Sequence, residues 1–332
     1  MKKFFLRLSL FMLPIILISY PADKYISDTI RKSNSFAGWE YPTMNAIMDG
    51  KIDSEIIIHG SSRAWIDVDA TLLGSAFGTH AYNLGIDGHN FYLEYLRHQL
   101  LLDYNQKPKL IIQILDNHSL AKVPELTNPD QFLPYMLWNS KICKAINTYE
   151  GFNYYDCIFP LIRYYGKLDA LKEFKKLQKN PSENPVKRIR GSYGFDLQWN
   201  ATEFESLKKN LEKQHKTTFN TNLDTASVKL FDAYLKDCRS KNIRVVMVYA
   251  PDFIEGQKVM GNRKEIMDLY THFSKKYALT YYDYSNDSIS YQKKYFYNVM
   301  HLNKTGAKYF TTDLIAKLKN DKAVQTALRS KM

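Results

Sequence analysis

The chain has 332 residues, which suits one large domain with an insertion or a cap. Hydrophobic residues make up 45% of it, enough to build a full core, and its 25 tyrosines suit half-buried positions or sugar-binding surfaces. The formal net charge of +12 is compatible with nucleic acid, anionic lipid headgroups or an anionic polysaccharide as partner. No recognisable nucleic-acid-binding module is present, so nucleic acid is the least favoured of the three.

Metal and nucleotide chemistry also lack a sequence signal. The chain contains no GxxxxGK[ST], GxGxxG or HExxH motif, and its three cysteines form neither a CxxC pair nor a zinc-spaced cluster with histidine. We therefore expect no cofactor and no metal. Cys143 and Cys157 could form a disulfide in an oxidising compartment, or they could both be buried thiols.

The N-terminus resembles a secretion signal or a signal anchor. Lys2, Lys3 and Arg7 accompany the apolar run LSLFMLPIILISY, residues 8–20. The run is followed by no A-x-A-like cleavage site and by no cysteine that could take a lipid, which favours an uncleaved anchor over a cleaved signal. Tyr20 and Lys24 suit the membrane interface. A buried N-terminal helix is the alternative.

Positive charge before the apolar run leaves that end in the cytoplasm. We therefore predict a single-pass protein of the inner (cytoplasmic) membrane, with its C-terminal domain in the periplasm or extracytoplasmic space. Residues 1–22 would be the anchor, 23–53 a stalk and lead-in, 54–320 the folded domain, and 321–332 a C-terminal tail.

Short apolar runs alternate with helical patterns along the folded domain. The runs predict strands over residues 54–60, 79–85, 108–116, 242–251 and 279–285, and the helical spacing predicts helices over 90–103, 227–240, 265–277 and 306–319. Uniformly apolar strands separated by helices indicate a parallel sheet covered on both faces. The expected fold is an α/β three-layer αβα sandwich of flavodoxin-like type, with about five strands and ligands at their carboxyl ends.

Residues 117–226 interrupt this rhythm. We predict a mostly helical insertion over the active-site end of the sheet, because loops of that length are usually functional. A flexible decoration is the alternative. The insertion contains the basic and aromatic segment KRIRGSYGFDLQW, residues 187–199. Its side chains best suited to bind a glycan are Arg188, Arg190, Tyr193 and Trp199.

Two loops carry residue types suited to nucleophilic chemistry. The turn His59-Gly60-Ser61-Ser62-Arg63 follows the first strand and places Ser62 at the start of a helix, where free N–H groups can stabilise an oxyanion. His301 lies in a polar loop before the last helix, and histidine is the side chain best suited to act as a base near neutral pH.

Together, GSSRAW after the first strand and HLNKTGA before the last helix resemble the SGNH/GDSL hydrolase superfamily. The resemblance implies Ser62 as nucleophile and His301 as base, with Ser61 in place of the usual Asp. It also implies oxyanion donors in the N–H groups of Ser62 and Gly85, with Asn117 as a weaker candidate. It covers residues 54–117 and 242–320. It is closest to membrane-anchored members that act on envelope polymers, such as alginate O-acetylation and teichoic-acid D-alanylation proteins.

One position departs from the family pattern. Asn298 stands where the family has the Asp that fixes the tautomer of the histidine and stabilises its imidazolium form. Three interpretations remain open. The site could operate as a Ser–His dyad, it could use another carboxylate (Asp87, Asp116 or Asp283), or it could bind polymer without turning it over.

The resemblance implies serine-dependent acyl transfer or ester hydrolysis, of the O-acetyl type, on a cell-envelope or exported polysaccharide. An acylated glycan would be the substrate, and a membrane acyltransferase is a possible partner. The alternative is a catalytically degenerate glycan-binding or scaffold protein of a polysaccharide assembly complex.

Overall fold

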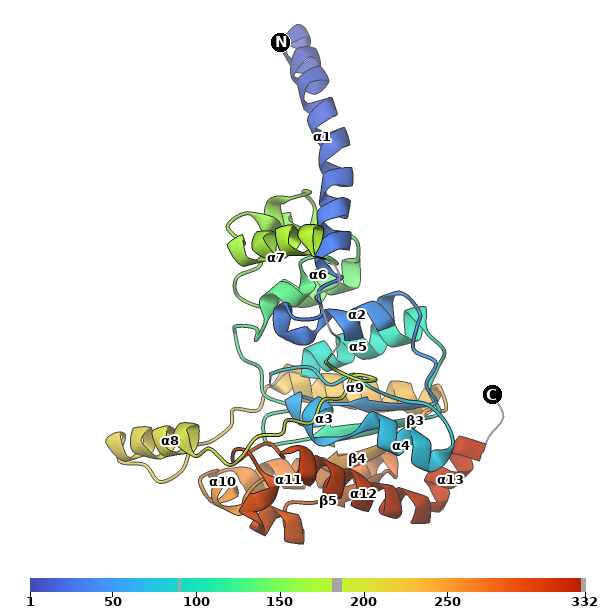
Figure 1. The fold of residues 1–332 in the computed structure, drawn as a ribbon, viewed down its shortest axis with the longest axis vertical. Coiled ribbons are helices and arrows are strands. Elements are labelled where there is room, and N and C mark those ends of the chain that lie inside the picture. Colours follow the sequence, from blue (N-terminus) through green and yellow to red (C-terminus); the bar gives the residue numbers. More distant parts are fainter. Residues whose placement is uncertain (89–90, 181–186, 330–332) are drawn as a thin grey trace. The chain divides into compact units, whose positions relative to one another are not determined.

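The structure is a computed structural model that describes residues 1–88, 91–180 and 187–329 (Figure 1). The chain divides into two compact units. The first combines residues 1–45 with residues 124–187, and the second combines residues 46–123 with residues 188–332. Each unit is described below by itself.

A five-stranded parallel sheet forms the centre of the second unit. The strands are β1 (Ile56–His59), β2 (Ala81–Asn83), β3 (Leu110–Leu115), β4 (Arg244–Tyr249) and β5 (Thr280–Asp283), in the order β2-β1-β3-β4-β5. Ile58 is in register with Asn83 on one side and with Ile112 on the other. The predicted α/β fold with its all-parallel central sheet is confirmed.

Helices cover both faces of this sheet. On one face lie α3 (Ser62–Asp67), α4 (Ala70–Phe77), α12 (Lys304–Asn320) and α13 (Lys322–Arg329), and on the other lie α5 (Phe91–Tyr104), α9 (Thr225–Ser240) and α11 (Arg263–Tyr277). Figure 1 shows α5 and α9 on the opposite side of the strands from α12 and α13. The remaining helices of this unit include α8 (Thr202–Lys213), α10 (Ile254–Lys258) and the short turns Ser288–Tyr291 and Lys293–Tyr295. Helix α2 (Tyr41–Met48) contains the division between the units.

Successive side chains of β1 are buried on opposite faces of the sheet. Ile56 and Ile58 are buried in the core that also contains Phe310 and Leu314 of α12. His59 points the other way, and its ring contacts those of His98 and Tyr234 on α5 and α9. A strand buried on both faces needs no polar alternation.

The first unit is mostly helical. It contains α1 (Lys2–Ile30), α6 (Ser140–Ile146), α7 (Leu168–Lys179) and short turns at Ala37–Trp39, Pro129–Phe132, Tyr154–Cys157 and Ile162–Tyr164. Asp23 of α1 accepts two hydrogen bonds from Arg163, with both side chains buried, and Ser27 bonds Tyr164. A disulfide joins Cys143 to Cys157. Paired, buried groups of this kind hold the two chain segments together.

These boundaries differ from the predicted ones. Residues 23–45, expected as a stalk, pack with residues 124–187, which were expected over the active site as the first part of the insertion. The predicted tail also folds: Val324 of α13 is fully buried in the core of the second unit. A C-terminal helix docked in this way belongs to the domain rather than trailing from it.

The N-terminal helix is long and apolar enough to cross a membrane. Within α1, an 18-residue window has a mean hydropathy of 1.8, and none of that window is buried. A helix in the core of a soluble protein would bury such a window. Helix α1 therefore has the length and composition of a single-pass anchor or of a signal sequence.

Candidate active site

The turn after β1 presents Ser62 at the carboxyl edge of the sheet. Gly60 has a φ of 146°, and a Cβ there would lie 2.9 Å from the carbonyl oxygen of Ile114. The turn therefore requires glycine. Ser61 caps α3 by accepting a hydrogen bond from the Arg63 N–H at 3.3 Å, and its hydroxyl donates to Asp116 at 2.6 Å. Ser62 is the first residue of α3.

The loop before α12 brings His301 to this serine. The Oγ of Ser62 and the Nε2 of His301 are 2.9 Å apart, although the two residues are 239 positions apart in the chain. The loop is tied back on itself by a hydrogen bond of 3.1 Å from the Tyr297 N–H to the carbonyl oxygen of His301. The structure thus joins the two residues that the sequence singled out.

Asn298 fixes the ring of His301 in the useful tautomer. Its Oδ1 accepts hydrogen bonds from the backbone N–H groups of Met300 (3.0 Å) and His301 (2.8 Å). Two N–H donors can face only the amide oxygen, so this oxygen, and not the amide nitrogen, lies 3.2 Å from Nδ1 of His301. Nδ1 must then carry the proton, which leaves the lone pair of Nε2 directed at Ser62.

This arrangement separates two roles that a carboxylate usually combines. The amide oxygen of Asn298 supplies orientation and tautomer, but it supplies no negative charge to the imidazolium. Each of the three carboxylates suggested by the sequence accepts a hydrogen bond from a group outside the dyad. Asp87 accepts from the Trp65 indole, Asp116 from Ser61, and Asp283 from the Ser285 N–H. The contact between Asn298 and the ring of His301 agrees with the dyad interpretation, and a contribution from another carboxylate stays a prediction.

Asp67 is a positioning residue that sequence reasoning missed. It lies at the end of α3, fully buried, and accepts a hydrogen bond of 3.0 Å from the Leu302 N–H. Helix α3 is thereby fastened to the histidine loop. Burial raises the pKa of Asp67 to about 8, although Arg63, 3.7 Å away, lowers it in part. The only signal in the sequence was an acidic residue, Asp67, in the otherwise apolar stretch from Ala64 to Val68.

Aromatic side chains pack against the dyad. The ring of Tyr297 is stacked on that of His301, with centroids 5.5 Å apart and an interplanar angle of 7°. Phe195 contacts Tyr297 and also Trp65 of α3. Backbone hydrogen bonds from Tyr193 to Trp65 and from Asn200 to Tyr297 hold residues 193–200 beside the site. Residues 193–200 therefore lie beside Ser62 and His301, and their role in binding substrate stays a prediction.

Two of the predicted glycan-binding side chains are used in the fold instead. Arg188 is buried, with its guanidinium 3.8 Å from the centre of the Trp65 ring. Arg190 donates to the carbonyl oxygen of Ala81 and to Asp53 and Ser54. These partners lie at the amino-terminal ends of β1 and β2, the edge of the sheet opposite to Ser62. These contacts give no support to the prediction that Arg190 lines the substrate site.

The other two residues are half-buried rather than free. The Tyr193 ring contacts Phe195, and the Trp199 ring packs against Phe253 with the ammonium group of Lys293 4.9 Å from its centre. Phe195 links Tyr193 to Tyr297, the ring stacked on His301, whereas Trp199 is part of the packing around the core.

Gly85 does not offer a free oxyanion donor. Its N–H donates to Oδ1 of Asn83 at 3.0 Å, and a Cβ on Gly85 would lie 2.7 Å from the Trp65 nitrogen. Gly85 is thus needed for close packing against α3, and its predicted role in the oxyanion hole is not supported. Gly88 follows on the same loop, and its N–H donates to no atom among the described residues.

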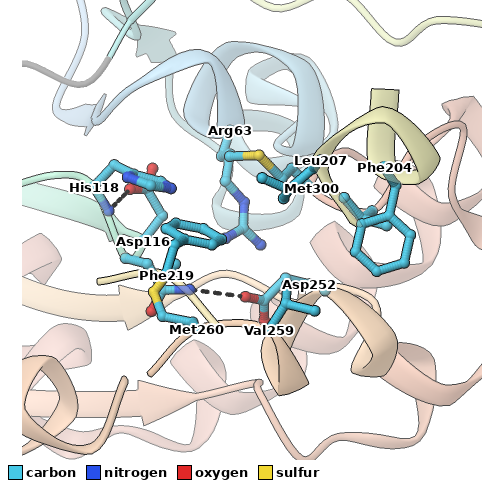
Figure 2. A pocket seen from close by; sticks show the side chains of 13 residues that line it. Arg63, Asp116, His118, Phe204, Leu207, Phe219, Asp252, Val259, Met260 and Met300 are labelled. Carbon is cyan, nitrogen blue, oxygen red and sulfur yellow. Dashed lines mark hydrogen bonds between the residues drawn. The ribbon is translucent and has the colours of Figure 1, made fainter. Parts of the chain in front are cut away.

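A small cavity is lined by chain neighbours of Ser62 and His301 but by neither residue of the dyad itself (Figure 2). Its walls include Arg63, next to Ser62, and Met300, next to His301, and Figure 2 shows the Arg63 side chain reaching into it toward Asp252. The space measures about 50 Å³, room for a few waters or one small group. Asn117 lies here, with its amide nitrogen 3.4 Å from Asp252, so it faces the cavity and not an established oxyanion position. Apolar side chains complete the wall: Phe204, Leu207, Phe219, Val259 and Met260.

Comparison with known proteins adds no identification. No family model and no curated protein matches this chain. Within the described residues, no group of three or more His, Cys, Asp or Glu side chains is placed to hold a metal ion. The resemblance to the SGNH/GDSL superfamily therefore remains a prediction that rests on short sequence blocks.

Proposed function

We propose that this protein is a membrane-anchored, extracytoplasmic serine acyltransferase or esterase of the SGNH/GDSL type, acting on O-acyl groups of an envelope or exported polysaccharide. The single observation that carries the proposal is the 2.9 Å contact between Ser62 and His301, with the lone pair of Nε2 directed at the hydroxyl. A serine hydroxyl paired in this way to a tautomer-fixed imidazole is the arrangement of an activated nucleophile.

The chemistry would proceed in two steps. His301 accepts the proton of Ser62 as the hydroxyl oxygen attacks the acyl carbonyl carbon, and the N–H of Ser62 at the start of α3 faces the developing oxyanion. The alkoxide of the donor leaves with the proton from His301, which gives an acyl-serine and a free alcohol. In the second step His301 deprotonates a sugar hydroxyl or water, which takes the acyl group and restores Ser62.

The cavity of about 50 Å³ beside Arg63 and Met300 has a largely apolar wall, but neither Ser62 nor His301 lines it, so the acyl group is not assigned from it. Phe195, in residues 193–200, and Tyr297, in the loop that carries His301, lie beside the dyad. Both have aromatic rings of the kind that pack against sugars.

Two features support the extracytoplasmic location. Helix α1 carries its positive residues, Lys2, Lys3 and Arg7, at the N-terminal end, and this orients the remaining chain outward. The Cys143–Cys157 disulfide is of a kind that persists in oxidising compartments. We assign the anchor to the inner membrane and the two units to its outer side.

A catalytically degenerate glycan-binding protein is the second candidate, and Asn298 is the observation that favours it. An uncharged partner for the imidazole removes part of the driving force for proton transfer. The two candidates are separated by turnover of a small acyl ester, such as p-nitrophenyl acetate, with and without a glycan acceptor.

For that experiment, we expect slow but measurable release of p-nitrophenol by the wild type. Ser62→Ala and His301→Ala should each remove it to a similar extent, because residues that act as a unit are not additive. Ser75→Ala, an exposed serine on α4, is the matched control and should keep the wild-type rate. If Ser62→Ala also keeps that rate, the catalytic proposal fails and the binding proposal replaces it.

A further inference from the structure

The first unit carries an exposed aromatic surface beside the C-terminal end of the apolar stretch of α1. We define the aromatic collar as Trp138, Tyr154, Tyr155, Ile158 and Phe159. All five side chains are large and apolar, and all are between 41% and 66% exposed. Five such residues within 22 positions of one compact unit form a patch of the type that marks interaction sites.

The collar is attached to α1 at one point. The Tyr20 hydroxyl donates to the carbonyl oxygen of Ile158 at 3.3 Å, and the Tyr20 ring makes an edge contact with Trp138. Lys24, one turn further along α1, lies over the Trp138 ring. The rings of Tyr155 and Phe159 stack on each other. The collar therefore lies at the level where the exposed apolar stretch of α1 ends.

The length of that stretch is the second observation. From Phe4 to Tyr20 α1 spans about 24 Å, at about 1.5 Å per residue. The hydrocarbon core of a bilayer is about 30 Å thick. Where the apolar stretch of a spanning helix is shorter than the core, the residues that flank the stretch are drawn into the bilayer surface. For α1 those flanking residues, on the outward side, are Tyr20 and the collar that it contacts.

We propose that the aromatic collar is seated in the outer headgroup region of the membrane that α1 crosses, so that the first unit is held on the bilayer by two contacts, a spanning helix and an interfacial surface. Tyrosine and tryptophan are the residues that favour this depth, because each joins an apolar ring to a polar group. The inference rests on the proposed membrane location of α1 but on neither the dyad nor the acyl chemistry.

The structure also explains how the collar keeps its shape. The Cys143–Cys157 disulfide joins α6 to the turn that carries Tyr154 and Tyr155. Asp23 of α1, deep in the same unit, accepts from the Leu161 N–H at 2.7 Å, just beyond Phe159. Both ends of the exposed segment are thus fixed to buried parts of the unit, so the rings are presented as a rigid surface.

The test uses the full-length chain in vesicles of phosphatidylcholine and phosphatidylglycerol, with or without lipids brominated near the headgroup end of the acyl chain. An environment-sensitive fluorescent amino acid replaces one residue at a time. Tyr155 reports on the collar. Leu10 reports on α1. Ser35 is an exposed position in the same unit. It follows the end of α1 at Ile30, which is itself about 15 Å along the helix from Tyr20. We expect Tyr155 and Leu10 to be quenched several-fold more strongly than Ser35.

A charge substitution sharpens the test. Tyr155→Glu, with the fluorescent residue at Tyr154, should lower quenching to the level of Ser35. Tyr291→Glu, which alters a tyrosine of 55% exposure in the other unit, should leave it unchanged. The proposal is overturned if the residue at 155 behaves like that at 35 while position 10 is quenched, because α1 then spans without seating the collar. It is also overturned if position 155 is shielded in native membranes but not in pure lipid, since a protein partner then covers it.

Discussion

Asn298→Asp tests whether residue 298 only orients the ring of His301 or could also stabilise its imidazolium form with a negative charge. The change replaces the amide by a carboxylate whose oxygen stays 3.2 Å from Nδ1 of His301 and still accepts both backbone N–H groups. Only the charge changes, so any effect on rate reports stabilisation of the imidazolium that forms in the transition state.

The magnitude follows from that distance. Two unit charges 3.2 Å apart interact by about 5 kcal/mol at an effective dielectric constant of about 20. Asn298 is half-buried, so water screens part of this attraction. The carboxylate also loses some of its hydration because it lies against the ring of His301. A net gain of about 1.5–3 kcal/mol remains, about 10- to 100-fold in rate. The roughly 10⁴-fold effect known for the reverse change in a protease includes a wrong tautomer, which the oxygen of Asn298 already prevents.

The assay is hydrolysis of p-nitrophenyl acetate as a function of pH. A carboxylate beside the ring favours imidazolium and raises the pKa of His301, so the acid limb of the profile should move to higher pH as the plateau rises. Asn200→Asp is the control, since it adds the same charge at an exposed position in the segment that bonds Tyr297. Equal rates for the two variants, or loss of activity in Asn298→Asp while Ser62 stays reactive, would refute the assigned role of Asn298.

Three further outcomes follow from the structure. Asp67→Ala should cost about 1–3 kcal/mol of unfolding free energy and slow ester turnover, since it leaves the buried Leu302 N–H unpaired, whereas Asp67→Asn should retain most turnover. The folded state holds the pKa of Asp67 at about 8, whereas the unfolded chain ionises this group at about pH 4, so the free energy of unfolding of the wild type falls as pH rises from about 4 to 8. Asp67→Asn cannot ionise. Chemical denaturation should therefore show the free energy of unfolding of Asp67→Asn, relative to that of the wild type, rising over this pH range. Arg190→Ala should lower the melting temperature but leave turnover and glycan binding unchanged, because its partners lie at the far edge of the sheet; weakened glycan binding without destabilisation would contradict this. A C-terminal alkaline phosphatase fusion should be active and remain with membranes after high-salt washing, whereas a soluble periplasmic product lacking the first 20 or so residues would show that α1 is cleaved.

The fold and the reactive pair were accessible from the sequence for different reasons. Runs such as residues 54–60 and 108–116 have an apolar centre, Ile56–Ile58 and Leu110–Ile112, which is typical of strands buried on both faces, and this pattern is local. The pairing of Ser62 with His301 is not local. It was reached through the resemblance of two short blocks to a known family, and the 2.9 Å contact agrees with it.

What escaped prediction depends on contacts between distant segments. Residues 23–45 were predicted as part of a stalk because nothing near Asp23 in the sequence indicates that it will pair with Arg163. We predicted Arg188 to be an exposed cation because charged side chains are seldom buried. In the structure its guanidinium is covered by the ring of Trp65. The N–H of Gly85 was assigned from its place in a motif, and its use by Asn83 is visible only when the turn is folded.

The central claim is that Ser62 is a nucleophile activated by His301. Labelling with a fluorophosphonate probe, followed by peptide mass spectrometry of the full-length protein, tests it most directly. The account predicts a single adduct on the peptide containing Ser62, absent in Ser62→Ala and strongly reduced in His301→Ala. No adduct on the folded wild type, or an adduct on another serine that survives in Ser62→Ala, would contradict it.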